Sequence, residues 1–506
     1  MTSLRVFGRA PILRPVTCVR DMSHGHEILS VAEMGAADRA AVAAGTLGTV
    51  LMQRAGAGVA AVIQERYAPR PVVVLCGPGN NGGDGYVAAR LLAEAGWPAR
   101  TASAARTGLR GDAAAAARLW TGPDSPLGPA SIDGAELVVD ALFGAGLSKP
   151  LDPELQVLLR AAEMSGAPIV GVDLPSGLPG DSAAPLEYAP ACALTVTFHR
   201  KKPAHVLEPG RGLCGEVVVV DIGLADPGSG SLFENDPELW LDRFPWPSTT
   251  SHKHARGSLV VVSGPMSQTG AARLAARAGL RIGAGLVTVL SPPDALLVNA
   301  AQLEAVMVRP FGNEGELAIA GATADAAVIG PAAGVNLATH ANVLALTETG
   351  IALVIDADAI TVFKDEPDHL FVALDDRDVM TPHPGEFERI FPGVLKASPH
   401  RIVAARTAAM RAGAVLLLKG PDTVVAAPDG RAAVNTNASP FLATAGSGDV
   451  LAGFIGGLIA QGMASFEAAC AGAWIHAEAG RQFGPGLIAE DLPELAPGVL
   501  EQLYAR

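Results

Sequence analysis

The sequence predicts two α/β domains, each a three-layer sandwich around a largely parallel sheet. Short runs rich in valine, leucine and isoleucine, such as 71–76 and 258–263, recur in both halves and alternate with stretches of helical period. A chain of 506 residues also exceeds what one hydrophobic core usually holds. A Gly/Ser/Pro-rich stretch over 227–237 is the expected linker between the two domains.

The composition indicates a well-buried globular protein, with 49% apolar and 17% charged residues. The net charge of −14 argues against nucleic acid as a partner, because a phosphate backbone needs a basic surface. The five cysteines are scattered without a Cys-x-x-Cys pair, which favours a reducing, cytoplasmic compartment. No apolar run reaches the roughly 18–20 residues of a membrane span. Residues 1–26 are expected to form a disordered tail.

The first α/β unit contains a glycine-rich turn. We expect a strand over 71–76, the turn over 77–85 and a helix over 86–95. The turn matches Gly-x-Gly-x-x-Gly, but a dinucleotide-binding fold also needs an acid about 20 residues further on, and 97–106 contains none. We therefore expect no hydride-transferring dehydrogenase. Oxygen atoms suit hard cations and sugar or amide contacts, and three side chains of the turn offer them: Asn80, Asn81 and Asp84.

Three more strands of the first half, expected over 136–140, 168–173 and 192–198, end in polar or glycine-containing segments. The carboxyl ends of parallel strands meet at one edge of a sheet, which is where ligands bind. A single aspartate after a strand is more often a turn or N-cap residue, but four converging strand ends indicate a binding site. The side chains expected to meet there are Asn81, Asp140, Asp173 and Ser176.

Residues 27–226 resemble the YjeF-N family, the epimerase of hydrated NADH and NADPH. Three segments in order support the resemblance: Asn80-Asn-Gly-Gly-Asp-Gly, Val139-Asp-Ala-Leu-Phe-Gly-Ala-Gly-Leu and Val172-Asp-Leu-Pro-Ser-Gly. It implies a Rossmann-like three-layer sandwich with Asp173 as the acid/base residue at the C6 carbon of the substrate. It also implies a potassium ion held by Asn81, Asp140 and Ser176. The implied substrate residues are Asn80, Asn81, Gly82, Gly83, Asp84, Gly144, Ala145, Gly146, Leu147, Ser148, Lys149, Pro150 and Asp173.

The first half departs from the family pattern at two positions. Gln53 stands where the family usually has an acid, and Pro203 stands where glycine is usual. Both changes concern local substrate contacts and leave the expected fold intact.

The second half repeats the alternation of strand and helix. We expect its strands over 258–263, 286–290, 326–330, 352–356, 378–381 and 414–419, and a helix over 272–283. This alternation predicts a second parallel α/β layer sandwich. The sequence has no Gly-x-x-x-x-Gly-Lys-Ser/Thr, so a P-loop nucleotide site is excluded.

The stretch 435–460 carries the clearest chemical signal. Gly446 and Gly448 precede a run of small apolar residues that is typical of a buried helix. Unpaired N–H groups and the helix dipole make such an N-terminus an anion site, most naturally for phosphate. Asp449 lies at this turn, where the dipole is expected to keep it ionised, so it could accept a proton from a substrate hydroxyl. The alternative is that Asp449 is only an N-cap.

Residues 238–506 resemble the YjeF-C family, a nucleotide-dependent dehydratase of the same hydrated cofactors with a ribokinase-like fold. The Gly446-Ser-Gly-Asp449 turn carries the resemblance, and 331–334 departs from it by being less rich in glycine. It implies that Asp449 is the catalytic base and that ADP is the co-substrate. The implied substrate residues are Ala271, Gly334, His383 and Asp449. The implied nucleotide residues are Lys419, Gly420, Pro421, Asp422, Thr423, Gly446 and Gly448.

Together these features predict a bifunctional repair enzyme. It would interconvert the R and S forms of hydrated NADH and NADPH and dehydrate the S form, with ADP giving AMP and phosphate. Asp356 and Asp358 could help to hold Mg²⁺. Two alternatives stay open: a small-molecule kinase fused to a non-catalytic Rossmann-like module, and a scaffold whose first half binds RNA-processing partners. We expect a cytoplasmic homo-oligomer without nucleic-acid or membrane partners.

Overall fold

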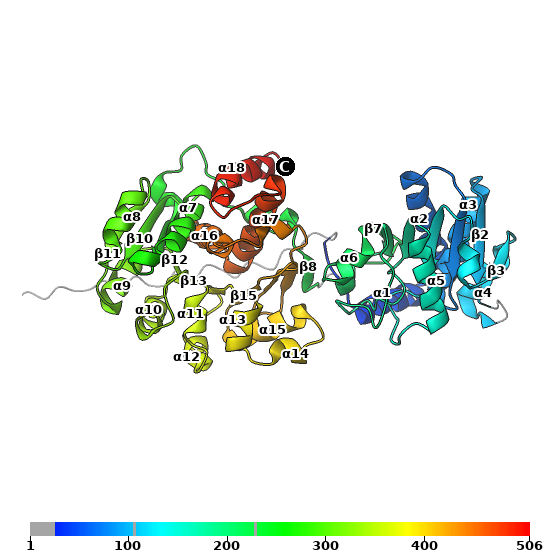
Figure 1. The fold of residues 1–506 in the computed structure, drawn as a ribbon, viewed down its shortest axis with the longest axis horizontal. Helices are drawn as coiled ribbons and strands as arrows, with labels where there is room; N and C mark the ends of the chain where they lie inside the picture. Colours follow the sequence, from blue (N-terminus) through cyan, green and yellow to red (C-terminus); the bar gives the residue numbers. More distant parts are fainter. Residues whose placement is uncertain (1–25, 105–107, 227–229) are drawn as a thin grey trace, which may run out of the picture.

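The computed structural model describes residues 26–104, 108–226 and 230–506. They form two α/β domains that meet near strand β8 and helix α6 (Figure 1). The N-terminal sheet has the strand order β3-β2-β1-β4-β5-β6-β7 and all its pairs are parallel. Its strands are β1 (Val72–Cys76), β2 (Ala99–Ser103), β3 (Asp124–Pro126), β4 (Leu137–Ala141), β5 (Ile169–Val172), β6 (Leu194–Phe198) and β7 (Glu216–Val220).

Helices cover both faces of this sheet because alternate residues of each strand face opposite sides. In β1, Val72 and Val74 join one apolar cluster, and Val73 and Leu75 join another. The predicted three-layer sandwich is therefore confirmed for the N-terminal domain. Its helices are α1 (Val31–Ala43), α2 (Gly48–Arg66), α3 (Asn80–Glu94), α4 (Gly111–Leu119), η2 (Pro129–Ile132), α5 (Pro153–Met164), η3 (Pro203–His205) and α6 (Gly210–Cys214).

The expected glycine-rich turn is wrong in its extent, because α3 begins at Asn80 rather than near Tyr86. Its glycines allow close packing of a helix start and do not serve a turn with positive φ. A Cβ at Gly82 would lie 2.0 Å from the Gly77 carbonyl oxygen, and one at Gly85 would lie 2.7 Å from the side chain of Ala141. Tertiary packing against the strand ends thus overrides the weak helix propensity of the asparagines and glycines.

The C-terminal sheet has the strand order β11-β10-β9-β12-β13-β14-β15-β16-β17-β8. It is parallel except at β16, which runs antiparallel to both of its neighbours. The strands are β8 (Leu232–Glu234), β9 (Ser258–Val262), β10 (Leu286–Ser291), β11 (Met307–Pro310), β12 (Ala326–Ile329), β13 (Ala352–Ile355), β14 (Val379–Met380), β15 (Val415–Leu418), β16 (Val424–Ala426) and β17 (Ala432–Val434).

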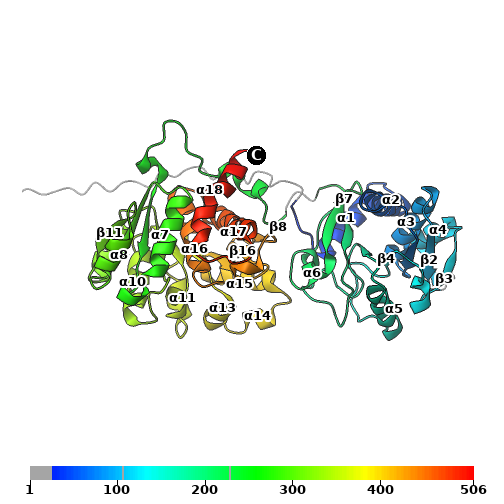
Figure 2. The same cartoon turned by 45° about the horizontal axis from the view of Figure 1, so that its top comes forward.

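Two helical layers cover this second sheet. Helices α7, α16, α17 and α18 pack together on one face (Figure 1, Figure 2), and α9, α10, α11, α13 and α15 contribute to the core on the other. The α-helices are α7 (Gly270–Arg281), α8 (Leu296–Gln302), α9 (Glu314–Gly321), α10 (Leu337–Thr347), α11 (Asp358–Thr361), α12 (Pro367–Phe371), α13 (Pro384–Ile390), α14 (Val394–Ala397), α15 (Arg401–Ala412), α16 (Ser447–Ala460), α17 (Ser465–Phe483) and α18 (Asp491–Tyr504). The 3-10 helices are η4 (Pro237–Leu239), η5 (Leu241–Arg243), η6 (Lys253–Arg256), η7 (Met266–Gln268) and η8 (Pro440–Leu442).

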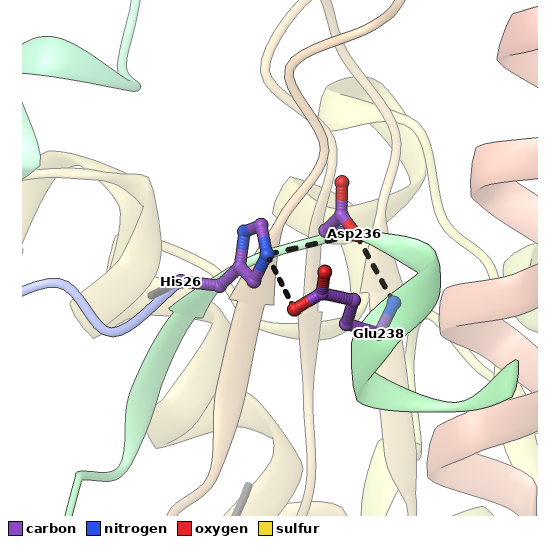
Figure 3. Close-up of side chains that lie close together, drawn as sticks. All are labelled: His26, Asp236 and Glu238. Carbon is purple, nitrogen blue, oxygen red and sulfur yellow. Dashed lines mark hydrogen bonds and ion pairs between the residues drawn. The ribbon is translucent and has the colours of Figure 1, made fainter. Parts of the chain in front are cut away.

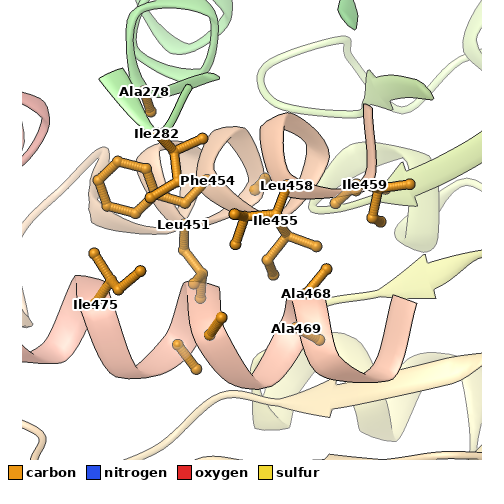
Figure 4. Close-up of a cluster of buried hydrophobic side chains, with 14 of the residues drawn as sticks. Ala278, Ile282, Leu451, Phe454, Ile455, Leu458, Ile459, Ala468, Ala469 and Ile475 are labelled. Atoms are coloured by element: carbon orange, nitrogen blue, oxygen red, sulfur yellow. The ribbon is translucent and has the colours of Figure 1, made fainter. Parts of the chain in front are cut away.

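Helix α16 lies at the centre of the larger core and is buried along almost its whole length. Figure 4 shows Phe454 and Ile455 of this helix among side chains of α7 and α17. Its glycines let α7 approach closely, since a Cβ at Gly453 would lie 2.2 Å from the Ala275 carbonyl oxygen. The tight packing fixes the N-terminus of α16, which carries Asp449.

The predicted linker is wrong over part of its length. Residues 232–234 form β8, which pairs in parallel with β17 at the edge of the C-terminal sheet. The Gly/Ser/Pro composition of 227–237 concealed a short strand whose backbone groups find partners on an open sheet edge. Residues 227–229 of the predicted linker lie outside the described part of the chain, as does the predicted tail except for His26.

Backbone hydrogen bonds run from one domain to the other through the segment 26–29. Glu27 bridges Phe233 of β8, and Ile28 bridges Lys201 of the N-terminal domain. The Leu29 N–H donates to the Lys201 carbonyl oxygen at 3.0 Å. In Figure 3, the His26 ring lies against two carboxylates of the C-terminal domain, with Nε2 3.3 Å from Glu238 Oε2 and 3.6 Å from Asp236 Oδ1.

No helix in the described part of the chain is long and apolar enough to cross a membrane. The expected homo-oligomer and cytoplasmic location stay predictions.

We expect Gly453→Ala to destabilise the C-terminal domain by about 1–3 kcal/mol, because the new methyl group meets backbone of α7 and forces the helices apart. Gly498→Ala is the matched control, since α18 has open space at that position and alanine favours a helix more than glycine does. Urea denaturation of both variants measures the difference. Equal stability of the two variants would contradict the packing described for α16.

Candidate functional site

A cavity of about 850 Å³ opens at the carboxyl edge of the N-terminal sheet. It lies where the strand order reverses between β1 and β4, which is where ligands bind in doubly wound folds. Its volume falls in the range of small-molecule and cofactor sites. Helix α1, the start of α3 and the loops after β4 and β5 contribute to its lining.

Asp173 follows β5 and is held in place by several contacts. Its backbone has φ 65°, a left-handed conformation that aspartate tolerates better than most residues. One carboxylate oxygen accepts hydrogen bonds from Lys202 Nζ at 2.8 Å and Thr197 Oγ1 at 2.9 Å, and the other accepts from the Ala145 N–H at 2.8 Å. Burial alone would raise the pKa of Asp173, but the Lys202 charge and these hydrogen bonds lower it to about 2. Asp173 is therefore a carboxylate at neutral pH.

Lys202 and His205 hold Asp173 in place, and the sequence reasoning did not single them out. Lys202 is almost fully buried, and its ammonium group contacts Asp173, Thr197 and the Phe198 carbonyl oxygen. His205 Nδ1 accepts from the Lys202 N–H, and its Nε2 lies 2.8 Å from the Asp173 carbonyl oxygen. Burial lowers the pKa of His205 to about 4, so its ring is neutral. The signal was the Lys-Lys pair at 201–202, which follows the end of β6 after two intervening residues, at the same edge of the sheet.

The structure brings Asp140 and Ser176 together at the end of β4. Ser176 Oγ donates to Asp140 Oδ1 at 2.6 Å, and the Ser176 N–H donates to Asp140 Oδ2 at 2.8 Å. Burial raises the pKa of Asp140, although the Ser176 hydrogen bonds oppose that shift. Asn81 lies beside the cavity, and its Nδ2 is buried without a hydrogen-bond partner in the described structure. A ligand could satisfy such an orphaned group.

Most of the predicted N-terminal substrate residues line the cavity. Those that do are Asn80, Asn81, Asp84, Gly144, Ala145, Gly146, Leu147, Ser148, Lys149 and Asp173. The structure does not place Gly82, Gly83 and Pro150 in its lining. Gly82 and Gly83 are buried in the first turn of α3, where they permit the helix to pack. The departures Gln53 and Pro203 also lie outside the lining, and Gln53 accepts a hydrogen bond from Arg90.

A second group of charged residues lies at the carboxyl edge of the C-terminal sheet. Lys419 Nζ donates to Asp356 Oδ1 at 2.8 Å and lies 3.9 Å from Glu386 Oε2. Asp356 is buried, and Thr381 Oγ1 donates to the same carboxylate oxygen. A Cβ at Gly448 would lie 3.4 Å from Lys419 Nζ, so the start of α16 lies beside the lysine. This combination of a cation and free helix N–H groups suits a phosphate group.

Asp449 occupies the first turn of α16 and is partly buried. The expectation that the helix dipole keeps Asp449 ionised meets an opposing effect of its surroundings. Burial and the charge of Asp356 raise the pKa of Asp449 to about 6, against the opposing effect of Lys419. Asp449 is still mostly ionised at neutral pH, and it binds a proton more readily than an ordinary aspartate. Those are the properties of a general base.

The turn before α16 has a support that the sequence reasoning missed. Gly446 adopts φ 87°, a left-handed conformation that requires glycine in practice. His476 of α17 lies beneath the turn, and its Nε2 is 3.0 Å from Ser447 Oγ and 2.9 Å from the Ser447 carbonyl oxygen. Burial lowers the pKa of His476 to about 4. A neutral buried histidine therefore fixes the turn without adding a charge near Asp449.

The loop after β12 meets the loop after β13 beside this site. Gly334, with φ 83°, donates its N–H to Asp358 Oδ2 at 2.8 Å. Ala332 also adopts a left-handed φ of 54°, at a place where the implied family pattern is richer in glycine. Alanine adopts this left-handed conformation at a cost of about 1 kcal/mol or more of local strain. Ala271, another predicted substrate residue, lies half-buried in the first turn of α7.

His383 is the N-cap of α13 in the structure. Its Nδ1 accepts from the Gly385 N–H at 2.9 Å, and its own N–H donates to Glu386 Oε2 at 2.9 Å. Half of the side chain is exposed. Its predicted contact with substrate stays a prediction beside this structural role.

The loop 419–423 forms a tight turn closed by Thr423, whose Oγ1 donates to the Gly420 carbonyl oxygen at 2.8 Å. The Asp422 side chain is buried and reaches the other domain. It pairs with Arg401 and accepts the Glu208 N–H at 3.1 Å. Any contact of Asp422 with a nucleotide would therefore come from its backbone.

Comparisons with known proteins match each of the two domains to a protein family. Residues 48–204 match the family model described as YjeF-related protein N-terminus, and 259–494 match the model described as NAD(P)H-hydrate dehydratase. Proteins named bifunctional NAD(P)H-hydrate repair enzyme Nnr from Salinibacter ruber and Moorella thermoacetica are each 34% identical to this chain. The alignments cover 94% of this chain and 96% and 97% of those relatives. The Escherichia coli relative of the same name is 34% identical, covering 87% of each chain.

Lys202→Met should raise the pKa of Asp173 from about 2 to above its usual value, because burial then acts without the opposing charge. Because the pKa of Asp173 is lower in the folded protein, its carboxylate stabilises the fold above about pH 4. This stabilisation is lost as the pH falls through about 2. The variant should therefore lose roughly 3–5 kcal/mol near neutral pH. Carboxyl NMR titration measures the pKa of Asp173, and urea denaturation measures the loss of stability.

Lys201→Met is the control, since Lys201 pairs with Glu234 instead. An unchanged Asp173 pKa in Lys202→Met would contradict the assignment.

Proposed function

We infer, because this chain belongs to the family of bifunctional NAD(P)H-hydrate repair enzymes, that its two sites act in sequence on hydrated NADH and NADPH. The N-terminal domain interconverts the R and S forms at C6, and the C-terminal domain dehydrates the S form with ADP. The observation that carries this function is the presence of both aspartate sites in one chain. Asp173 lies in a cavity of cofactor size, and Asp449 lies in the first turn of α16.

In the N-terminal domain, Asp173 provides a fixed negative charge in the cavity. Lys202 keeps it ionised, and the Ala145 N–H orients its second oxygen. Loss of the C6 hydroxyl would leave positive charge on the ring, because the ring nitrogen next to C6 supplies electrons. A carboxylate in a buried site stabilises such charge far more than water does. Asn81, with its buried unpartnered amide, is a contact for the polar part of the substrate.

A potassium ion fits the group of oxygens at the end of β4. Asp140 carries a buried carboxylate, and Ser176 Oγ lies within 3.3 Å of the Phe143 carbonyl oxygen. Carboxylate, hydroxyl and carbonyl oxygens are the ligands that hard cations prefer. We propose that Asp140 and Ser176 hold the ion, with Asn81 as a further ligand. When bound, it would neutralise the buried carboxylate and fix the loop that follows β4.

In the C-terminal domain, Asp449 removes the proton from the C6 hydroxyl, which then attacks the terminal phosphate of ADP. The hydroxyl oxygen bonds to phosphorus and the bond to AMP breaks. The phosphate ester later loses phosphate from C6 and a proton from C5 to solvent, which restores the dihydropyridine ring. Lys419 and the N–H groups at Gly446 and Gly448 stabilise the charge on the transferring phosphoryl group, which is mainly an electrostatic task. The sum of these steps is hydrate plus ADP giving NAD(P)H, AMP and phosphate.

A magnesium ion fits beside Asp356 and Asp358. Asp356 Oδ1 accepts hydrogen bonds from Lys419 and Thr381, and Asp358 Oδ2 accepts one from the Gly334 N–H, so each carboxylate has one further oxygen without a hydrogen bond in the described structure. Magnesium in nucleotide sites uses one or two carboxylates together with phosphate oxygens. We propose these two carboxylates as the protein contacts. When bound, the ion would neutralise negative charge on the phosphates of ADP.

Asp449→Asn should lower ADP-dependent dehydration of the S hydrate by at least about 100-fold and leave R-to-S exchange unchanged, because only the C-terminal base is lost. The appearance of NADH absorbance measures the first activity, and chromatographic separation of the R and S hydrates without ADP measures the second. Asp375→Asn, at an exposed pair with Arg377 in the same domain, is the control and should dehydrate normally. Retained turnover in Asp449→Asn would remove Asp449 from its role as base.

The dehydration rate should fall as the pH drops through about 6, because burial and Asp356 raise the pKa of Asp449 to that value and only the carboxylate is a base. Initial rates from about pH 5 to about pH 8 give the profile. A rate that stays constant across that range would contradict the assigned base.

A further inference from the structure

Helix α1 forms one wall of the N-terminal cavity, although none of its residues is fully buried. The side chains that line the cavity come from a single stripe of the helix: Val31, Met34, Gly35, Asp38 and Val42. Their spacing of three and four residues places them on one face. Ser30 caps the helix through a capping box, and the Val31 N–H donates to Asp181 Oδ1 at 2.8 Å. The stripe is therefore held in a defined position over the cavity.

Asp38 is the only ionisable residue on this stripe. Its carboxyl group makes no hydrogen bond or ion pair with any described residue, whereas Asp173 is fully engaged. The charged groups that face it are Asp84 of α3, Asp173 after β5 and Lys202 beside η3, together with Arg39 of its own helix. Burial raises the pKa of Asp38; Lys202 and Arg39 oppose that shift, and Asp173 adds to it.

The proposed exchange at C6 requires a proton donor that the site described so far lacks. The C6 hydroxyl leaves as water only if it gains a proton, and water that adds to the other face of the ring must lose one. Asp173 is ionised at neutral pH because Lys202 lowers its pKa to about 2, and so it holds no proton to give. The Lys202 ammonium group already donates to Asp173, Thr197 and the Phe198 carbonyl oxygen. A second carboxyl group on the cavity wall would complete the proton balance.

We propose that Asp38, from the α1 wall, is a catalytic acid of the N-terminal site and acts together with Asp173 on the C6 hydroxyl. This inference rests on the proposed epimerase function. Asp38 gives its proton to the leaving hydroxyl, the C6–O bond breaks, and water departs from a ring whose nitrogen shares the positive charge. Water then adds to the opposite face, and Asp173 accepts its proton. Asp173 releases this proton to solvent, solvent returns a proton to Asp38, and the reverse reaction runs through the same states.

Asp84 is the competing candidate, because it lines the same cavity and burial raises its pKa well above the usual value. It belongs to the first turns of α3 and is only 8% exposed, whereas Asp38 is half-buried and faces the cavity without a partner. Asp38 can therefore exchange protons with solvent between turnovers, as the cycle requires. Asp84 suits a neutral contact with substrate.

The test measures R-to-S exchange by the full-length protein on the isolated R hydrate, without ADP. Asp38→Asn should lower kcat by about 100-fold or more, the usual contribution of a general acid. In the unaltered protein the rate should fall as the pH rises through the pKa of Asp38, and Asp38→Asn should abolish that decline. Asp38→Glu should restore part of the rate. Ala36→Gln, a change at an exposed position of α1 outside the cavity lining, is the matched control and should keep both the rate and the pH profile.

Three outcomes overturn the proposal: normal exchange by Asp38→Asn, an unchanged pH profile in that variant, or loss of the profile in Asp84→Asn alone. ADP-dependent dehydration of the S hydrate by Asp38→Asn should equal that of the unaltered protein, which shows that the chain is folded. If the unaltered protein itself fails to accelerate exchange, the epimerase function fails. If it succeeds and Asp38→Asn matches it, only the role of Asp38 fails.

Discussion

The position of a buried lysine determines what each catalytic aspartate of this chain can do. In the N-terminal domain, Lys202 pairs directly with Asp173 and lowers its pKa to about 2. In the C-terminal domain, Lys419 pairs with Asp356 instead, and the pKa of Asp449 rises to about 6. In the proposed mechanism, one aspartate therefore serves as a fixed charge and weak proton acceptor, and the other as the base. Both arrangements depend on strand ends that bring the lysine and the carboxylate to one sheet edge.

The junction between the domains lies close to both arrangements. Lys201 pairs with Glu234 of β8, while the next residue, Lys202, reaches into the N-terminal cavity. On the other side, Asp422 of the predicted nucleotide loop accepts a hydrogen bond from Glu208. The segment 26–29 continues from these contacts into α1, which carries Asp38. Main-chain hydrogen bonds of this segment therefore connect the two domains.

The sequence predicted the fold class, most central strands of both sheets and the segments that carry Asp173 and Asp449, because strand patterns and glycine turns are local signals. The sequence did not predict features that depend on contacts between distant segments. The start of α3 at Asn80 depends on packing against β1 and β4, and β8 depends on an open edge at β17. Lys202, His476 and Asp38 become visible as functional residues only when distant segments meet. The two pKa values of Asp173 and Asp449 follow from burial and ion pairing, which no spacing reveals.

The measurement that tests the account most directly is recovery of NADH from a mixture of R and S hydrates with ADP, with ATP and with neither. The account predicts full recovery with ADP, at a rate beyond the slow spontaneous exchange of the two forms, and none without a nucleotide. Recovery that stops at the S fraction would mean that the N-terminal cavity does not catalyse exchange. No recovery with either nucleotide would contradict the function of both domains.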